Sequence, residues 1–254
     1  MAAELEFTVE GRVAWLTINR PQARNALNEA VRTGIREHLE AFEADPGLAV
    51  LVLTGAGDKA FCAGADLKEM SERQMTVPPP DFIPIPGLTL EVSKPIIAAV
   101  NGDALAGGFL LAQGCDLCVA ADHARFAISE VKVGRGAPWA VPLPWLMPPR
   151  VAMELLLTGD PIDAERAREL GFVNRVVPKD ELRPAVQQLA ERIAGNAPLS
   201  VRAAKRTVHL AAEAGVAEAF RSAQQLWEPV YLSSDAQEGP RAFREKRAPQ
   251  WTGT

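Results

Sequence analysis

Two apolar runs in this chain each end at a glycine, and small residues then lead from each run into a helical pattern. The runs are LAVLVLTG, which ends at Gly55, and IIAAVNG, which ends at Gly102. Uninterrupted apolar residues over such a length are typical of strands buried on both faces. The repeated order of strand, glycine and helix predicts an α/β fold.

A few residues after each glycine, small residues lead into the helix, in the segments Ala63-Gly64-Ala65-Asp66-Leu67 and Ala104-Leu105-Ala106-Gly107-Gly108. The first N–H groups of a helix have no partner inside the helix, and the helix dipole makes that end mildly positive. Small side chains leave those N–H groups uncovered, so two such ends facing one another could hold an oxygen that carries negative charge. Tight turns between strand and helix also need small residues simply to pack, and the spacing alone leaves that alternative open.

Other segments have clear periodicity. LEFTVE and RVAWLTI alternate between apolar and polar residues, which predicts two strands on either side of Gly11. Asn28 is placed to cap a helix whose apolar residues recur at helical spacing at Val31, Ile35, Leu39 and Phe42. A short helix is expected to begin near Asp66. The segment 76–90 contains five prolines and is expected to be a mobile surface loop.

The pattern becomes mainly helical after Met147. One strand-like run, FVNRVVP, interrupts it, and long helices are expected from Asp180 to the end of the chain. We therefore predict a core over residues 1–196 and a C-terminal helical region over residues 197–254.

Composition narrows the class of protein. Of 254 residues, 48% are hydrophobic and 23% are charged, which permits a substantial core, and the net charge is −5. That charge argues against nucleic acid as the main ligand, although a local basic patch could still hold a phosphate. No apolar run approaches the ~20 residues needed to span a bilayer, and MAAELEFTVE has no signal-peptide character. We expect a soluble, cytoplasmic protein.

The cysteines are Cys62, Cys115 and Cys118. The last two form a C-x-x-C pattern, but no second pair and no histidine at ligand spacing accompany it. Free cysteines usually behave as small buried hydrophobic residues, so packing is the favoured interpretation and no metal is expected.

Five segments in a fixed order carry a family resemblance: NRPQARNALN, FCAGADLKEM, AAVNGDALAGG, LLLTGDPIDAERARELGFVNRVV and AFREKRAPQW. Together they resemble the crotonase superfamily, also called the enoyl-CoA hydratase/isomerase family, from about residue 6 to residue 251. The resemblance implies an α/β spiral of ββα units, with C-terminal helices that assemble homotrimers or dimers of trimers. It also implies acyl-CoA thioester substrates, with no cofactor beyond the coenzyme A of the substrate.

The resemblance assigns the two glycine segments a role. In this family two backbone N–H groups polarise the thioester carbonyl, and by motif these belong to Ala65 and Gly107. Arg24 is expected to contact the phosphates of coenzyme A. The C-terminal Phe243 and Lys246 correspond to positions that reach the nucleotide from a neighbouring subunit, although Lys246 could also be an ordinary solvated charge. The remaining expected substrate-binding positions are Ala23, Ala63, Asp66, Leu67, Lys68, Ala106, Leu110 and Trp139.

The acid/base residues depart from the hydratase pattern. Hydratases of this family use two glutamates, and by motif Leu110 stands where the first would be, whereas Glu130 occupies the position of the second. One carboxylate can still move a double bond from the 3,4 to the 2,3 position by carrying a proton from the α- to the γ-carbon. Isomerisation or another single-acid reaction is therefore favoured. The alternatives are hydration by Glu130 and a water, and a CoA-binding scaffold that has lost catalysis.

Other side chains are weaker candidates for the missing acid. Asp103 is more readily explained as a turn-stabilising residue and Asp66 as a helix cap, while Asp116 and His123 have no stronger case. Glu130 itself could be a surface charge. The segment after Glu130 is about two residues shorter than in many relatives and holds Arg135, Trp139 and Trp145. The two tryptophans could form an aromatic wall for the acyl group or simply pack.

Overall fold

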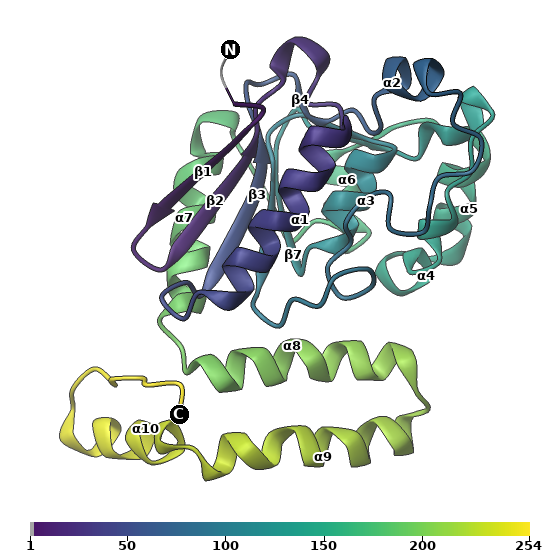
Figure 1. The fold of residues 1–254 in the computed structure, drawn as a ribbon. Helices are drawn as coiled ribbons and strands as arrows, with labels where there is room; N and C mark the ends of the chain where they lie inside the picture. Colours follow the sequence, from purple (N-terminus) through teal and green to yellow (C-terminus); the bar gives the residue numbers. More distant parts are fainter. Residues whose placement is uncertain (1–2) are drawn as a thin grey trace.

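The computed structural model describes residues 3–254, and two sheets form its centre (Figure 1). The larger sheet has six strands in the order β1-β2-β3-β5-β7-β10, antiparallel between β1 and β2 and parallel elsewhere. Its strands are β1 (Leu5–Glu10), β2 (Val13–Ile18), β3 (Val50–Gly55), β5 (Ile96–Val100), β7 (Leu117–Ala121) and β10 (Arg175–Val177). Every residue of β3 and β5 is buried, as the two apolar runs predict.

The smaller sheet has the order β4-β6-β8-β9. Its strands are β4 (Ala60–Cys62), β6 (Asp103–Leu105), β8 (Arg125–Ala127) and β9 (Ile162–Asp163). Strands β3 and β5 belong to the larger sheet, and each is followed by a strand of the smaller sheet and then by a helix, α2 (Leu67–Glu72) or α3 (Gly107–Gly114). This repeat of two strands and a helix confirms the predicted spiral of ββα units.

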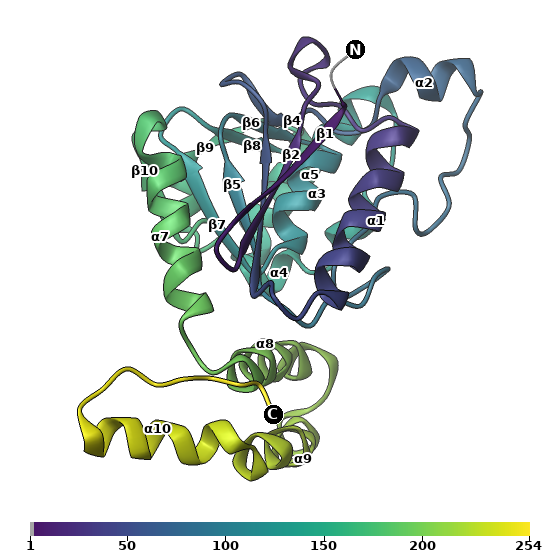
Figure 2. The same cartoon turned by 60° about the vertical axis from the view of Figure 1, so that its left-hand side comes forward.

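Helices cover both faces of the larger sheet (Figure 2). Helix α1 (Glu29–Ala44) begins where Asn28 accepts a hydrogen bond from the Val31 N–H, and its predicted apolar face is buried. On the other face α7 (Leu182–Ala194) packs against β2, β3, β5 and β7. Three further α-helices lie between α3 and α7 along the chain: α4 (Leu143–Leu146), α5 (Pro149–Thr158) and α6 (Ala164–Glu169).

Three helices lie beyond the sheets at the C-terminal end (Figures 1 and 2). They are α8 (Pro198–Glu213), α9 (Val216–Leu232) and α10 (Ser234–Glu245). None of the residues of α9 is buried within the chain. The expectation of helices to the chain end is wrong for residues 246–254, which are not helical. Within residues 3–254, no helix combines the length and apolar character that crossing a bilayer requires.

The proline-rich segment 76–90 differs from the expected surface loop. Residues 76–81 are almost entirely exposed, but Ile83 and Pro84 are buried and Ile85 is half-buried. The prolines prevent regular structure, whereas the isoleucines between them pack on α3.

Candidate active site

The two glycine segments lie in direct contact. Gly64 has a φ of +93°, and a side chain there would place Cβ 2.8 Å from the Cβ of Ala106 and 3.0 Å from the N atom of Gly107. A Cβ at Gly108 would overlap the carbonyl oxygen of Cys62. Glycine is therefore required at these positions because the two backbones approach closely.

Each segment presents an N–H group that has no acceptor in the part of the chain that the structure describes. Among residues 3–254, neither the Ala65 N–H nor the Gly107 N–H donates a hydrogen bond to a protein acceptor. Neighbouring groups are paired, since the Ala63 N–H donates to the Arg24 carbonyl at 3.0 Å and the Ala106 N–H to the Ala127 carbonyl at 2.9 Å. Two unpaired donors in touching loops form the kind of arrangement that accepts a polarised oxygen.

Ala106 and Asn25 hold these loops in unusual backbone conformations. Ala106, directly before Gly107, has φ 52° and ψ −119°, which is strained for a residue with a Cβ. Asn25 is fully buried at φ 56°, and its amide donates to the Ala56 and Ala60 carbonyls at 3.0 and 2.7 Å. Sequence reasoning assigned Asn25 no role, although asparagine is among the residues that adopt this backbone conformation most readily.

Glu130 lies in a short 3-10 helix, Ser129–Val133, that follows β8. Its carboxyl is half-buried, and Oε2 is buried without a hydrogen-bond partner among the described residues. Burial raises the pKa of Glu130 to about 7, whereas its own backbone N–H and the Trp139 side chain favour the charged form and act in the opposite direction. The interpretation of Glu130 as an ordinary surface charge is therefore wrong.

Aromatic rings pack against Trp139, the side chain that influences the pKa of Glu130. Phe109 stacks on Phe172 with ring centroids 4.6 Å apart, and the half-buried Trp139 lies 6.0 Å from Phe109. Trp145 is exposed and does not join them. The aromatic wall suggested by two tryptophans thus has only Trp139 from that segment, with buried phenylalanines behind it.

Leu110 is buried on α3, three residues beyond Gly107, and only 3% of its surface is exposed. It belongs to the main hydrophobic core. Leu110 therefore places an apolar side chain at the position where the two-glutamate pattern of hydratases has a carboxylate.

The other candidate carboxylates are all engaged elsewhere. Asp103 lies in β6 rather than in a turn, and it accepts two hydrogen bonds from Arg125 at 2.9 and 2.7 Å, so the turn-stabilising interpretation is wrong. Asp66 caps α2, as predicted, and pairs with Arg20 at 3.0 Å. Asp116 accepts from the Ile96 N–H at 2.7 Å and pairs with Lys205 at 2.9 Å. His123 is exposed and bonds the Asp58 carbonyl.

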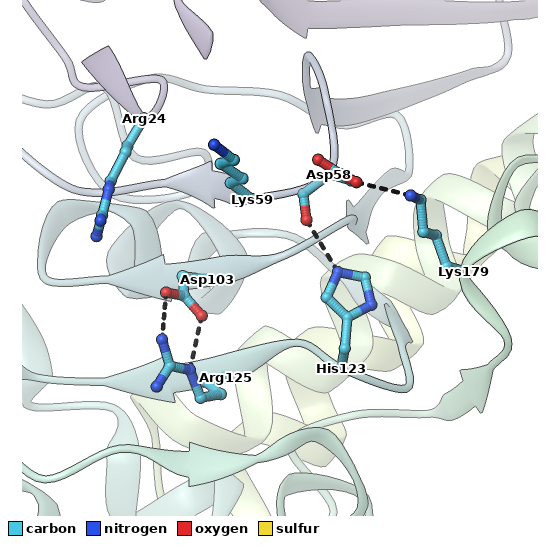
Figure 3. Close-up of a pocket in the computed structure, with 7 residues that line it drawn as sticks. All are labelled: Arg24, Asp58, Lys59, Asp103, His123, Arg125 and Lys179. Atoms are coloured by element: carbon cyan, nitrogen blue, oxygen red, sulfur yellow. Dashed lines mark hydrogen bonds and ion pairs between the residues drawn. The ribbon is translucent and has the colours of Figure 1, made fainter. Parts of the chain in front are cut away.

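Arg24 lines an open surface hollow of about 470 Å³ (Figure 3). The other lining residues are Asp58, Lys59, Asp103, His123, Arg125 and Lys179. Lys179 pairs with Asp58 at 2.7 Å and Arg125 with Asp103, but the Arg24 and Lys59 side chains have no ion-pair or hydrogen-bond partner within residues 3–254. The sequence did not single out Lys59 as a candidate. The one signal that could have done so is its place as a basic residue directly before β4, the strand that leads to Ala63.

The remaining predicted substrate-binding residues are more dispersed. Ala23 and Ala63 are half-buried near the Arg24 loop, while Leu67 and Lys68 are exposed on α2. Phe243 and Lys246 are exposed at the end of α10, far from α2 and α3 in Figure 1. A single chain does not bring these two residues to the site.

The cysteines are free thiols. Burial raises the pKa of Cys62 and of Cys118 to about 12 and also raises that of Cys115, so all three stay protonated. The residues from 3 to 254 contain no cluster of His, Cys, Asp and Glu that could hold a metal ion.

Comparisons with known proteins agree with this geometry. The sequence pattern of the enoyl-CoA hydratase/isomerase family matches residues 8–254. A carnitinyl-CoA dehydratase of Citrobacter koseri is 40% identical, with 100% of both chains covered. Crystal structures of enoyl-CoA hydratases from Mycobacterium marinum and Mycobacterium tuberculosis are 41% and 42% identical, each with a TM-score of 0.92 and with 99% of this chain and 100% of the other covered. The chain belongs to the enoyl-CoA hydratase/isomerase family, whose members act on acyl-CoA thioesters.

Proposed function

We propose that this enzyme removes and returns protons beside the thioester of an acyl-CoA, with Glu130 as its single acid/base residue. The observation that carries the proposal is the pair of unpaired N–H groups, from Ala65 and Gly107, in two loops that touch. A thioester oxygen accepting both would gain negative charge as the α-proton leaves. Donors already in place stabilise that enolate more than they stabilise the substrate.

A single acid/base residue favours isomerisation of a 3-enoyl-CoA to a 2-enoyl-CoA. Leu110 supplies no carboxylate, and Asp66, Asp103 and Asp116 are held by other partners. The carboxyl of Glu130, with a pKa of about 7, is suited to take a proton from the α-carbon and give it to the γ-carbon.

A second candidate is reversible hydration of a 2-enoyl-CoA. The names of similar proteins favour it, because the curated relatives are called carnitinyl-CoA dehydratase and the solved relatives enoyl-CoA hydratase. In that reaction Glu130 alone would serve both the water and the α-carbon.

The two reactions separate in one assay. Incubation with 2-enoyl-CoA and with 3-enoyl-CoA in deuterated water, followed by mass and absorbance, measures hydration, isomerisation and α-proton exchange together. Conversion of 3-enoyl-CoA with little hydration supports isomerisation. Hydration of 2-enoyl-CoA at ordinary enzymatic rates would overturn it in favour of the second candidate, and tight CoA binding without turnover of any thioester would leave only a scaffold.

We further propose that Arg24 and Lys59 bind the phosphates of coenzyme A. Both cations line one hollow and have no side-chain partner among the described residues, and the backbone carbonyl of Arg24 accepts the Ala63 N–H. Removing either side chain, as Arg24→Ala or Lys59→Ala, is expected to raise KM for an acyl-CoA by about tenfold, the worth of one charge-assisted hydrogen bond. Steady-state kinetics should show kcat little changed.

The matching control uses a substrate without phosphates. An acyl-pantetheine thioester should show the same KM with both variants as with the unmodified enzyme. Arg150→Ala, which removes an exposed arginine on α5, should leave KM for acyl-CoA unchanged. Equal KM values for acyl-CoA in all three variants would contradict the phosphate assignment.

The pH dependence of exchange should report Glu130. Proton abstraction needs the carboxylate, so the rate is expected to rise with pH and level off above about 7, the raised pKa of this group. Trp139→Phe removes an N–H that lowers this pKa, and its rising limb should therefore move to higher pH. A pH–rate profile of α-proton exchange measures both, and an unmoved limb in Trp139→Phe would exclude this influence of the indole.

The C-terminal helices are proposed to assemble a homotrimer or a dimer of trimers. Support comes from apolar side chains that the single chain leaves exposed, namely Val208, Val216, Phe220, Tyr231, Leu232 and Phe243. In such an assembly Phe243 and Lys246 would approach the coenzyme A bound to a neighbouring subunit. Sedimentation analysis of the full chain measures the assembly on which this placement depends.

A further inference from the structure

Ile83 packs against the glycine that presents one of the two free N–H groups. A Cβ at Gly107 would lie 2.7 Å from Cδ1 of Ile83, 3.3 Å from Cα of Gly64 and 3.4 Å from Cδ1 of Leu27. The Ile83 methyl therefore occupies the space beside Gly107 that any larger residue would need. It comes from the proline-rich segment, far from either glycine loop along the chain.

The segment around Ile83 lies along one face of α3. A Cβ at Gly114 would lie 3.3 Å from Cγ2 of Ile85 and 3.4 Å from Cδ of Pro86. Gly107 and Gly114 are seven residues apart, which places them on the same side of a helix. Ile83 and Ile85 thus fill two shallow positions on α3, and only the first adjoins the free N–H.

The Arg32 side chain of α1 contacts this segment at Phe82. The Arg32 guanidinium lies 3.9 Å from the centroid of the Phe82 ring, donates to the Leu27 carbonyl at 2.6 Å and pairs with Glu69 at 3.0 Å. Arg32 is itself buried, so these contacts are shielded from water. The Leu27 N–H donates to the Gly64 carbonyl at 2.8 Å, which joins the same contacts to the first glycine loop.

We propose that Ile83 determines how much bulk the enzyme accepts at the α-carbon of the acyl group. The inference rests on the proposed function, in which the thioester oxygen accepts the Gly107 N–H. That bond would place the oxygen about 2.9 Å from the Gly107 nitrogen, and the α-carbon is two bonds beyond the oxygen. A branch at this carbon on the α3 side meets the Ile83 side chain, and the contact of Arg32 with the neighbouring Phe82 holds the backbone of this segment in place.

Exchange of α-protons with deuterated water tests this, because it needs only an enolate and not a particular overall reaction. Butyryl-CoA is a linear probe, and its isomer isobutyryl-CoA carries a methyl branch at the α-carbon while keeping one exchangeable proton there. Ile83→Ala is expected to raise the isobutyryl-to-butyryl ratio of kcat/KM by about tenfold, the low end of what one methyl group contributes in a pocket. Ile83→Phe should lower the ratio by a similar factor.

Ile85→Ala is the matched control, since Ile85 packs on the same helix face but at Gly114. Its ratio should equal that of the unmodified enzyme. An unchanged ratio in both Ile83 variants, or an equal change in Ile85→Ala, would overturn the inference while leaving the proposed function intact. If the unmodified enzyme exchanges neither thioester, the proposed function fails and this inference fails with it.

Discussion

Replacing Glu130 with glutamine is expected to lower the rate of α-proton exchange by about a thousandfold, within the range that a positioned acid/base residue contributes. Glutamine keeps the size and polarity of the side chain but cannot accept a proton. The described structure offers no obvious replacement, because Leu110 is apolar and the nearby candidate carboxylates are paired elsewhere. Mass spectrometry of an acyl-CoA incubated in deuterated water measures the rate.

Thermal unfolding across pH separates this loss from a loss of structure. Burial favours the protonated form of Glu130 and so raises its pKa to about 7. The stability that the folded protein has while this group is neutral is lost as pH rises through about 7. Glu130→Gln should therefore unfold at the same temperature as the unmodified protein below about pH 4.5, where Glu130 is neutral in both states, and at a higher temperature above pH 7. Exchange retained within a few-fold in a folded Glu130→Gln protein would rule out Glu130 as the acid/base residue.

Gly107→Pro is expected to lower the same exchange rate by a few hundredfold, the typical effect of removing one oxyanion donor. Proline has no N–H, and the first position of a helix is where proline is tolerated best. Binding of coenzyme A, measured by calorimetry, should survive in part because its phosphates are proposed to contact Arg24 and Lys59 instead.

Gly107→Ala distinguishes the lost N–H from the added bulk. Both variants place a Cβ 2.7 Å from Ile83, but only proline removes the donor. Alanine should therefore retain clearly more activity than proline, and Gly114→Ala, which crowds Ile85 on the same helix face, should retain nearly all of it. Equal losses in Gly107→Pro and Gly107→Ala would mean that space at this position matters and the N–H does not.

Residues with strong local signals were predictable from the sequence. The unbroken apolar runs of β3 and β5 leave little choice other than buried strands, and Asn28 and Asp66 are residues whose side chains accept the first N–H groups of a helix. Gly64, with its positive φ, and Gly108, against the Cys62 carbonyl, are required by the close approach of the two loops, whereas the nearest neighbour of Gly107 is the end of the Ile83 side chain.

The remaining features depend on contacts between distant segments. The pairing of β6 with β8 brings Asp103 beside Arg125, and no pattern near Asp103 predicts that register. Ile83 stands among five prolines that suggest a loop, and it packs against Gly107, a residue of a helix that begins more than twenty residues later in the sequence. Lys59 can be recognised as a candidate phosphate-binding residue only in the structure, where it lines the same hollow as Arg24.

The first turn of α3 and the pair of cations Arg24 and Lys59 are expected to differ in their sensitivity to ionic strength. Six of its eight residues are buried and apolar or glycine, so dissolved ions have no access to its sides. In the proposed function, the partial positive charge at the first turn of α3 would act on a bound thioester with little screening by salt. Arg24 and Lys59 lie in open solvent, where a Debye length of about 8 Å at physiological salt weakens their reach. If the proposed roles are correct, raising the salt concentration should weaken substrate capture at Arg24 and Lys59 and leave the rate of the proton-transfer step nearly unchanged.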